Sequence, residues 1–117
     1  MKRDLILFVE DILQNIELIE ESIKNISKLK FETNKLLIDA TVRRIEVIGE
    51  AAKNLPEVFK NKYPNVEWRK IAGTRDIIIH AYFGIDLDII WNIIKNDLSK
   101  LKKEMENILN KENKNNL

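Results

Sequence analysis

The side chains best suited to acid–base and phosphate chemistry lie within one short stretch of the sequence. His80 is the only histidine among the 117 residues, and the ordinary pKa of a histidine, about 6.5, lies close to neutrality. Arg75 and Asp76 precede it, Tyr82 follows it, and residues 77–79 are all isoleucine. A lone histidine in a helix is more often a structural residue with a satisfied hydrogen bond. Here, however, polar side chains share an otherwise apolar helix, where each must be paired or must serve a ligand.

Helical geometry relates these side chains to one another. Asp76 and His80 are four residues apart, so they share one face and the carboxylate can orient or charge the imidazole. Arg75 and Tyr82, seven apart, also nearly share a face. Arg75 and His80, by contrast, lie about 140° apart on an ideal helix, so one straight helix does not aim both at one phosphate. Two explanations stay open: a bend near Gly73 redirects the arginine, or a second copy of the chain completes the site.

An arginine and a histidine together are suited to cleaving a phosphodiester without a metal. The guanidinium binds the phosphate bidentately and stabilises the charge that develops on it. The imidazole moves protons to or from the attacking 2′-hydroxyl or the leaving oxygen, an effect of about 10²–10⁴-fold. RNA supplies its own nucleophile, so the protein needs none.

Several other enzyme classes lack the residues that they require. The chain has no cysteine, no second histidine for a di-iron Glu-x-x-His pair and no glycine-rich phosphate loop. Asp86 and Asp88 are better explained as helix-capping residues than as metal ligands. The sequence therefore predicts neither a metal site nor a cofactor.

Composition indicates one soluble domain built from long helices. The sequence is 44% hydrophobic and 33% charged, with only three glycines and two prolines, which leaves little room for the turns of an all-β fold. The apolar run at residues 5–9 is too short for a signal peptide or a membrane-spanning helix. We therefore expect no membrane anchor and a cytoplasmic location, which the absence of cysteine fits.

The charge balance bears on nucleic-acid binding. The net charge is +1, with 20 basic and 19 acidic residues, which is not the basic excess of a protein that coats nucleic acid. Any RNA must then be held at a local site. The basic residues at 43, 44, 69 and 70 are either an RNA-binding patch or a solvated face, and the solvated face is favoured for any single one.

Hydrophobic periodicity predicts four main helices. The first carries an apolar stripe at alternating spacings of four and three, which belongs to the core or partly to a second subunit. Asp4 is its expected N-cap, and residues 27–34 are the expected turn. A second helix is predicted over 35–55, with Gly49 and the alanines that follow placed where another helix passes closely. The stripe of the first helix consists of Leu5, Val9, Ile12, Ile16, Ile19, Ile23 and Ile26.

The second half of the chain contains the other two main helices. One helical turn is expected at 57–62, and Asn65 is expected to cap a third helix that runs to Phe83. We expect this helix to be bent or interrupted at Gly73 and Thr74 and to end at Gly84 in a left-handed conformation. Asp86 is expected to cap the last helix. The predicted fold is all-α, an up-and-down bundle of four to five helices in one domain over 1–109, with a disordered polar tail over 110–117.

Residues 75–82 match the Arg-x4-His-x-Tyr motif of HepT-like toxins, which are HEPN domains. Three further segments are similar in the same order, and the resemblance spans roughly residues 5–101. These segments lie at residues 48–52, 64–73 and 83–91. The short motif alone is weak evidence, whereas the ordered set of four segments is specific.

The resemblance implies both a fold and an activity. HEPN domains are helical bundles that usually form homodimers, with two Arg…His motifs at a shared cleft. HepT-like members are metal-independent endoribonucleases that act as toxins of type VII-like toxin–antitoxin systems. By resemblance, Arg75 and His80 are catalytic, Asp76 is a supporting polar residue, and Tyr82 is adenylylated by an MntA-like minimal nucleotidyltransferase antitoxin. Thr74 departs from the bulkier residue expected at its position, which concerns local packing more than chemistry.

Two other functions remain open alongside an RNA-cleaving toxin. One is a non-catalytic HEPN module that binds and regulates a nucleotidyltransferase, and the other is a structural helical dimer. The intact set of Arg75, His80 and Tyr82 favours the toxin over the idle module. Trp68 and Trp91 are expected to be core or interface anchors rather than base-stacking platforms.

Overall fold

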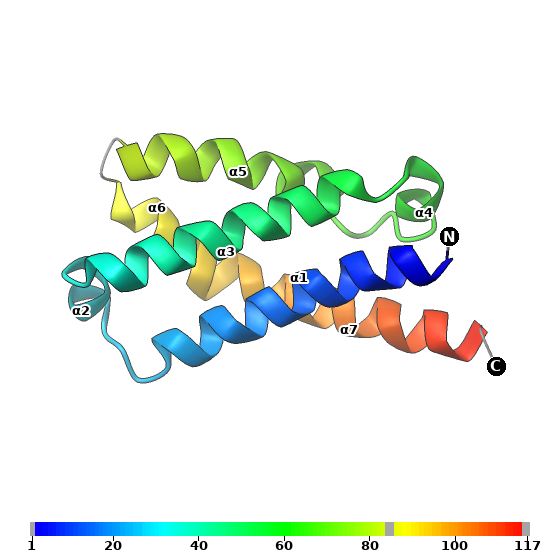
Figure 1. The fold of residues 1–117 in the computed structure, drawn as a ribbon, viewed down its shortest axis with the longest axis horizontal. Helices are drawn as coiled ribbons and strands as arrows, with labels where there is room; N and C mark the ends of the chain where they lie inside the picture. Colours follow the sequence, from blue (N-terminus) through cyan, green and yellow to red (C-terminus); the bar gives the residue numbers. More distant parts are fainter. Residues whose placement is uncertain (1, 84–85, 116–117) are drawn as a thin grey trace.

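Four long helical stretches run along the long axis of a bundle (Figure 1). The computed structural model describes the backbone of residues 2–83 and 86–115 and the side chains of residues 4–79 and 86–113, and it contains no strand in this part of the chain. The elements are α1 (Lys2–Ile23), α2 (Lys28–Glu32), α3 (Lys35–Asn54), α4 (Glu57–Asn61), α5 (Trp68–Phe83), α6 (Leu87–Asn92), a π-helical segment η1 (Ile93–Asp97) and α7 (Leu98–Asn115).

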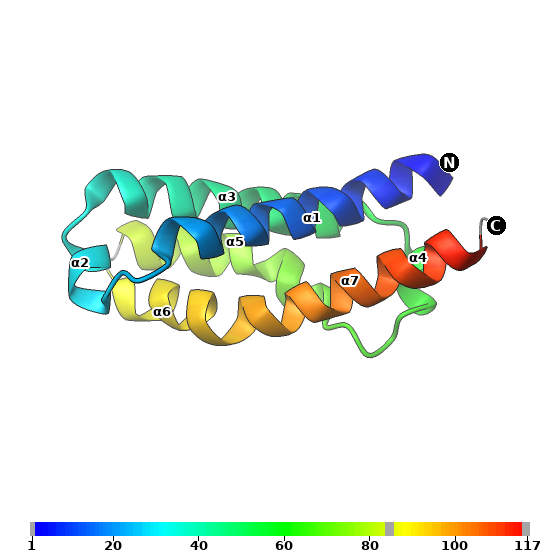
Figure 2. The same cartoon turned by 90° about the horizontal axis from the view of Figure 1, so that it is seen from below.

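The long helices alternate in direction. α1, α3 and α5 run back and forth, and α6, η1 and α7 together form the fourth stretch (Figure 2). α1 packs against α3 and α7, and α5 packs against α3 and α6. The short helices α2 and α4 lie at opposite ends of the bundle (Figure 1). The predicted all-α, up-and-down architecture is therefore confirmed.

The apolar stripe of the first helix forms the centre of the core. Val9, Ile12, Ile16 and Ile19 are each 0% exposed, and burial of such side chains contributes about 1.5–3 kcal/mol each. Leu5 and Ile26, at the two ends of the stripe, are partly buried against the same core. The part of this stripe that is fully buried belongs to the core of one chain.

The first residues of α1 and α2 differ from the prediction, and side-chain caps determine where α2 and α3 begin. α1 begins at Lys2, so Asp4 lies in the first turn, where its charge interacts favourably with the helix dipole. The predicted turn at 27–34 contains α2, because the Ser27 side chain caps it by accepting a hydrogen bond from the Lys30 amide at 3.2 Å. Asn34 caps α3 in the same way through the Leu37 amide, at 3.0 Å.

The start of α5 also corrects a predicted cap. α5 begins at Trp68 rather than after Asn65. The reason is a buried turn: the Trp68 amide donates to the Val66 carbonyl at 2.9 Å, and its indole nitrogen donates to the Tyr63 carbonyl at 3.1 Å. The predicted short helix near 57–62 is present as α4. The expected stop at Gly84 lies outside the described residues.

The last helical stretch is longer and less regular than predicted. Asp86 holds the N-cap position of α6, but its side chain makes no capping hydrogen bond. α7 continues to Asn115, so the prediction of a disordered tail is wrong for residues 110–115. The physical reason is Glu112, which is 2% exposed and accepts hydrogen bonds from the Tyr63 hydroxyl and from Lys62 Nζ, the latter at 3.0 Å.

This buried contact predicts a loss of stability at high pH. Burial, and then the hydrogen bond to the Glu112 carboxylate, raise the pKa of Tyr63 above its ordinary value of about 10. Above about pH 10 the tyrosine loses its proton in the unfolded chain but keeps it in the folded one. The free energy of unfolding therefore falls by about 1.4 kcal/mol per pH unit, whereas below about pH 10 the contribution of Tyr63 to it does not change with pH.

Urea unfolding between about pH 9 and about pH 11 measures this effect. We expect the free energy of unfolding of the wild type to fall more steeply with pH than that of Tyr63→Phe, which has no proton to lose at this position. Equal slopes for the two proteins would contradict the buried Tyr63–Glu112 contact.

Candidate active site on helix α5

The helix that carries the predicted catalytic motif is continuous. α5 runs without a break from Trp68 to Phe83, so the predicted interruption at Gly73 and Thr74 is wrong. Gly73 has no positive φ angle, and the Thr74 hydroxyl donates to the Lys70 carbonyl at 2.9 Å within the helix. Regular helical spacing therefore applies to the backbone between residues 75 and 80.

Arg75 lies where α5 passes close to α3. A Cβ atom built on Gly49 would lie 3.4 Å from the Ile71 carbonyl oxygen and 3.6 Å from the Cβ atom of Arg75. This confirms the close helix approach predicted from the small residues of the second helix. It also places the residue after Gly49, Glu50, beside the arginine.

Glu50 is the partner of Arg75 and was not among the predicted site residues. Its Oε1 atom accepts a hydrogen bond from Arg75 Nη1, and the two side chains are 42% and 47% exposed. The signal that could have identified Glu50 was its position next to Gly49, since a close approach of two helices brings the neighbouring side chains together. The pair holds the guanidinium at the surface, between α3 and α5.

The other predicted site residues are placed only in part. Asp76 is exposed and forms no ion pair with any side chain that the structure describes. The backbone of His80 and Tyr82 belongs to α5, whereas their side chains lie outside the described residues. The structure thus brings Arg75 together with Glu50, and the expected contact of Asp76 with His80 stays a prediction.

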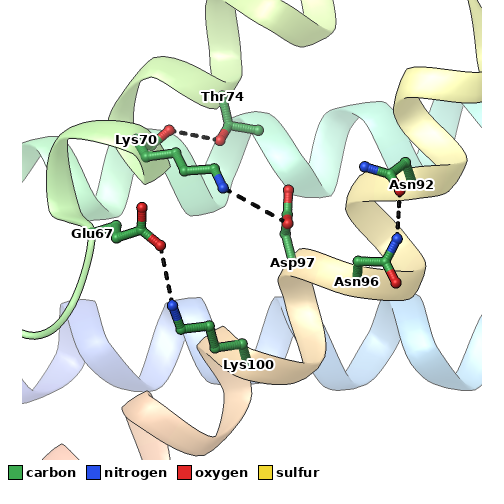
Figure 3. Close-up of polar contacts among 7 residues, drawn as sticks. All are labelled: Glu67, Lys70, Thr74, Asn92, Asn96, Asp97 and Lys100. Atoms are coloured by element: carbon green, nitrogen blue, oxygen red, sulfur yellow. Dashed lines mark hydrogen bonds and ion pairs between the residues drawn. The ribbon is translucent and has the colours of Figure 1, made fainter.

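On its other side, α5 is tied to η1 and α7 by ion pairs. Lys70 lies 3.9 Å from Asp97, and Lys100 donates to Glu67 at 3.1 Å (Figure 3). The hydrogen bond from Lys100 lowers the pKa of the Glu67 carboxyl. The four paired side chains also line a cavity of about 230 Å³, whose apolar lining residues are called its floor. The floor consists of Ile45, Ile48, Ile71, Ile93, Leu98 and Leu101.

The tryptophans pack in the interior and at its edge. Trp68 is 7% exposed and is the core anchor that was predicted. Trp91 is partly buried, with its ring centroid 5.2 Å from that of Phe31, and Lys95 Nζ lies 4.8 Å from the same ring. Among the described residues, no three histidine, cysteine or acidic side chains gather closely enough to hold a metal ion. No helix in the described part is long and apolar enough to cross a membrane.

Comparison with known proteins gives consistent matches. A family model described as "Ribonuclease HepT-like" matches residues 12–108. A Methanocaldococcus jannaschii protein named "Putative RNase" is 43% identical over 105 residues, which cover 90% of this chain and 96% of the relative. A Thermococcus cleftensis protein named "Probable ribonuclease HepT" is 43% identical over 108 residues, which cover 92% of this chain and 98% of the relative.

A longer relative matches nearly the whole chain. It is a Methanocaldococcus jannaschii protein named "Gamma-glutamylcyclotransferase and putative RNase", 47% identical over 115 residues. The alignment covers 98% of this chain and 52% of that protein, so this chain spans about half of it. No solved structure gives a significant match.

The family match extends from Ile12 in α1 to Ile108 in α7 and includes the whole of α5. It confirms the resemblance that was inferred from four ordered segments. The chain belongs to the Ribonuclease HepT-like family.

Proposed function

We propose that this protein is a toxin-type endoribonuclease that cuts RNA without a metal ion, with Arg75 and His80 as its catalytic residues. The observation that carries the proposal is the position of Arg75, held at the surface of a continuous helix five residues before the single histidine. Its guanidinium contacts Glu50 through Nη1, and its other N–H donors remain suited to a phosphate. Relatives named as ribonucleases support the substrate class.

The proposed reaction is a transesterification within RNA. The 2′-oxygen attacks the adjacent phosphorus, and the bond from phosphorus to the 5′-oxygen of the next nucleotide breaks. His80 accepts the proton of the 2′-hydroxyl or donates one to the leaving 5′-oxygen. Arg75 stabilises the negative charge that builds on the phosphate oxygens. Asp76, four residues before His80, supports the charged imidazole.

A homodimer is part of this proposal, because positions 75 and 80 lie about 140° apart around one regular helix. Large apolar side chains are exposed in α2, early in α3 and in α6, at the end of the bundle where α5 ends (Figure 1). Leu29 is 70% exposed, Leu36 82% and Ile89 39%. Exposed apolar groups at this end of a small bundle support contact with a second copy, although Val58 at the opposite end is also 80% exposed.

Neutralisation by a nucleotidyltransferase is the proposed regulation. Tyr82 lies seven residues after Arg75 on α5, so the two positions nearly share a face. An adenylyl group on the Tyr82 hydroxyl would bring a phosphate charge towards Arg75 and would add bulk where RNA is expected to bind. We expect an MntA-like enzyme with ATP to add adenylate to the wild type and none to Tyr82→Phe. Mass spectrometry measures this, and an adenylylated form that cuts RNA at the wild-type rate would contradict the proposal.

The chemistry is tested with two oligonucleotides of one sequence, one all-RNA and one all-2′-O-methyl, in excess chelator. We expect cleavage of the RNA only, with products that end in a 2′,3′-cyclic phosphate and a 5′-hydroxyl. Cleavage of the 2′-O-methyl strand would exclude the 2′-hydroxyl as nucleophile. If neither strand is cut, the alternative of a non-catalytic HEPN module that regulates a nucleotidyltransferase becomes the better account.

Glu50 is expected to act as a positioning residue for Arg75. The Glu50→Gln variant keeps the size of the side chain but removes its charge, so the guanidinium is held less firmly. We expect kcat for RNA cleavage to fall by about tenfold while KM changes little, because orientation matters most in the transition state. Steady-state kinetics of the two proteins measures this split. A variant with the wild-type kcat would show that the ion pair does not position the arginine.

A further inference from the structure

An open groove lies one helical turn from Arg75 and is bounded by basic side chains. It has a volume of about 860 Å³ and is formed by the end of α3, by α4, by the turn before α5 and by the first turn of α5. These segments lie together at one end of the bundle (Figure 1). The basic residues that line the groove are Lys53, Lys60, Arg69 and Lys70, and the acidic ones are Glu57 and Glu67.

Ion pairs leave this groove positively charged. Glu67 is paired with Lys100, which lies outside the groove lining, so its charge is already compensated (Figure 3). Glu57 lies 3.7 Å from Lys60, and Lys70 is paired with Asp97. Lys53 and Arg69, in contrast, are exposed and form no ion pair with any described side chain. Two uncompensated cations, one from α3 and one from α5, therefore line the groove.

The groove lies close to the catalytic position along α3 and α5. Ala72 lines the groove, and its carbonyl lies 3.6 Å from the Cβ position at Gly49, next to the Glu50–Arg75 pair. Arg69 precedes Arg75 by six residues, or about 9 Å along a helix axis. Lys53 follows Glu50 by three residues on α3, or about 4.5 Å along the helix axis, so both cations lie within two helical turns of the Glu50–Arg75 pair along their own helices.

The lining also indicates what kind of contact is made. Trp68, an aromatic residue of the groove, is 7% exposed and uses its indole N–H on the Tyr63 carbonyl. It therefore presents no free ring for base stacking, which is the other common way of holding single-stranded nucleic acid. The remaining attraction is between cations and phosphates, which does not depend on base identity.

We propose that this groove binds the phosphate backbone of the RNA next to the cleavage site, through Lys53 and Arg69. This inference rests on the proposed ribonuclease function, because it extends the RNA path from Arg75. It predicts binding that is insensitive to sequence and strongly dependent on salt. An acidic protein surface is the competing occupant, and it predicts no effect of the groove on RNA affinity.

The test uses a fluorescein-labelled, 2′-O-methyl oligouridylate, which has no 2′-hydroxyl and separates binding from cleavage. The Lys53→Gln/Arg69→Gln protein is compared with Lys24→Gln/Lys103→Gln, a control with the same change of charge. Lys103 is exposed on α7 and forms no ion pair with a described side chain. Lys24 directly follows α1, whose end lies at the other end of the bundle from α4 (Figure 1). A third protein, Lys53→Arg/Arg69→Lys, keeps both charges in the groove.

Fluorescence anisotropy at several salt concentrations gives the affinities. We expect the groove variant to bind about tenfold more weakly than the wild type at low salt. The slope of log K against log salt concentration is expected to be smaller by about 1.4, because two phosphate contacts are lost and each contributes about 0.7 on a single strand. The charge-preserving protein is expected to bind like the wild type. Equal RNA affinities of the groove variant and the control would overturn the inference, whether or not both proteins bind more weakly than the wild type.

Cleavage assays on the same variants separate this inference from the proposed function. If the wild type binds the oligouridylate through the groove but leaves unmodified RNA intact, the ribonuclease proposal fails and the groove assignment stands. If the groove variant binds and cuts unmodified RNA as the wild type does, the groove assignment fails and the ribonuclease proposal stands.

Discussion

Arg75→Ala and His80→Ala are each expected to abolish nearly all RNA cleavage while leaving the bundle folded. Loss of a preorganised group that stabilises charge in the transition state slows catalysis by about 10²–10³-fold, which is the expectation for Arg75→Ala. Loss of a general acid or base slows it by about 10²–10⁴-fold, which is the expectation for His80→Ala. Single-turnover cleavage of one labelled RNA, with protein in excess, measures both rates without a contribution from product release.

The matched control removes a cation elsewhere on the surface. Lys103 is exposed on α7 and unpaired among the described side chains, so Lys103→Ala is expected to keep the wild-type rate. Circular dichroism must show equal helix content in all four proteins. If Arg75→Ala and Lys103→Ala cut RNA at similar rates, Arg75 is not catalytic. If His80→Ala retains the wild-type rate, His80 is not the general acid or base of the reaction.

Ile78→Ala is expected to have the largest effect on folding among the variants considered. Ile78 is 0% exposed, the least exposed of the α5 side chains that the structure describes. Truncation of such a side chain removes its burial and leaves a cavity, at a cost of about 2–5 kcal/mol. Because small domains are stable by only about 5–15 kcal/mol, a large part of the total would be lost. Urea denaturation gives the difference in the free energy of unfolding.

The neighbouring residue supplies the control for this prediction. Ile77 is 47% exposed on the same helix, so Ile77→Ala makes the same chemical change at the surface and is expected to cost less than about 1 kcal/mol. Both changes raise helix propensity by a similar amount at adjacent positions, because alanine is a better helix former than isoleucine. Equal destabilisation by the two changes would contradict the described orientation of α5, and with it the position of Arg75 towards α3.

Much of the fold could be predicted from the sequence because it depends on periodicity within single helices. The stripe from Val9 to Ile23 identifies the buried face of α1 without any knowledge of its partners. Gly49 marked the close approach of α3 and α5 for a similar reason, since a missing side chain is visible in the sequence. Family resemblance then supplied the catalytic assignment, which composition and spacing alone supported only weakly.

The features that were not predicted depend on residues distant in the chain. Glu112 belongs to a polar segment that looks disordered by composition, yet it is buried because Tyr63, 49 residues earlier, donates a hydrogen bond to it. The Glu50–Arg75 pair likewise joins residues 25 positions apart on two helices. The π-helical segment η1 lies inside a stretch whose apolar pattern reads as one helix. Local patterns carry no information on such contacts.

The most direct test of the central claim is whether the purified wild-type protein cuts bulk cellular RNA in excess chelator. We expect RNA to be cleaved in excess chelator, at a rate that does not increase when Mg²⁺ or Mn²⁺ is added back. The reason is that Arg75 and His80 are proposed to perform the reaction without a metal ion. Intact RNA after incubation with folded protein that carries no modification at Tyr82 would contradict the account. So would cleavage that appears only when a divalent metal is returned.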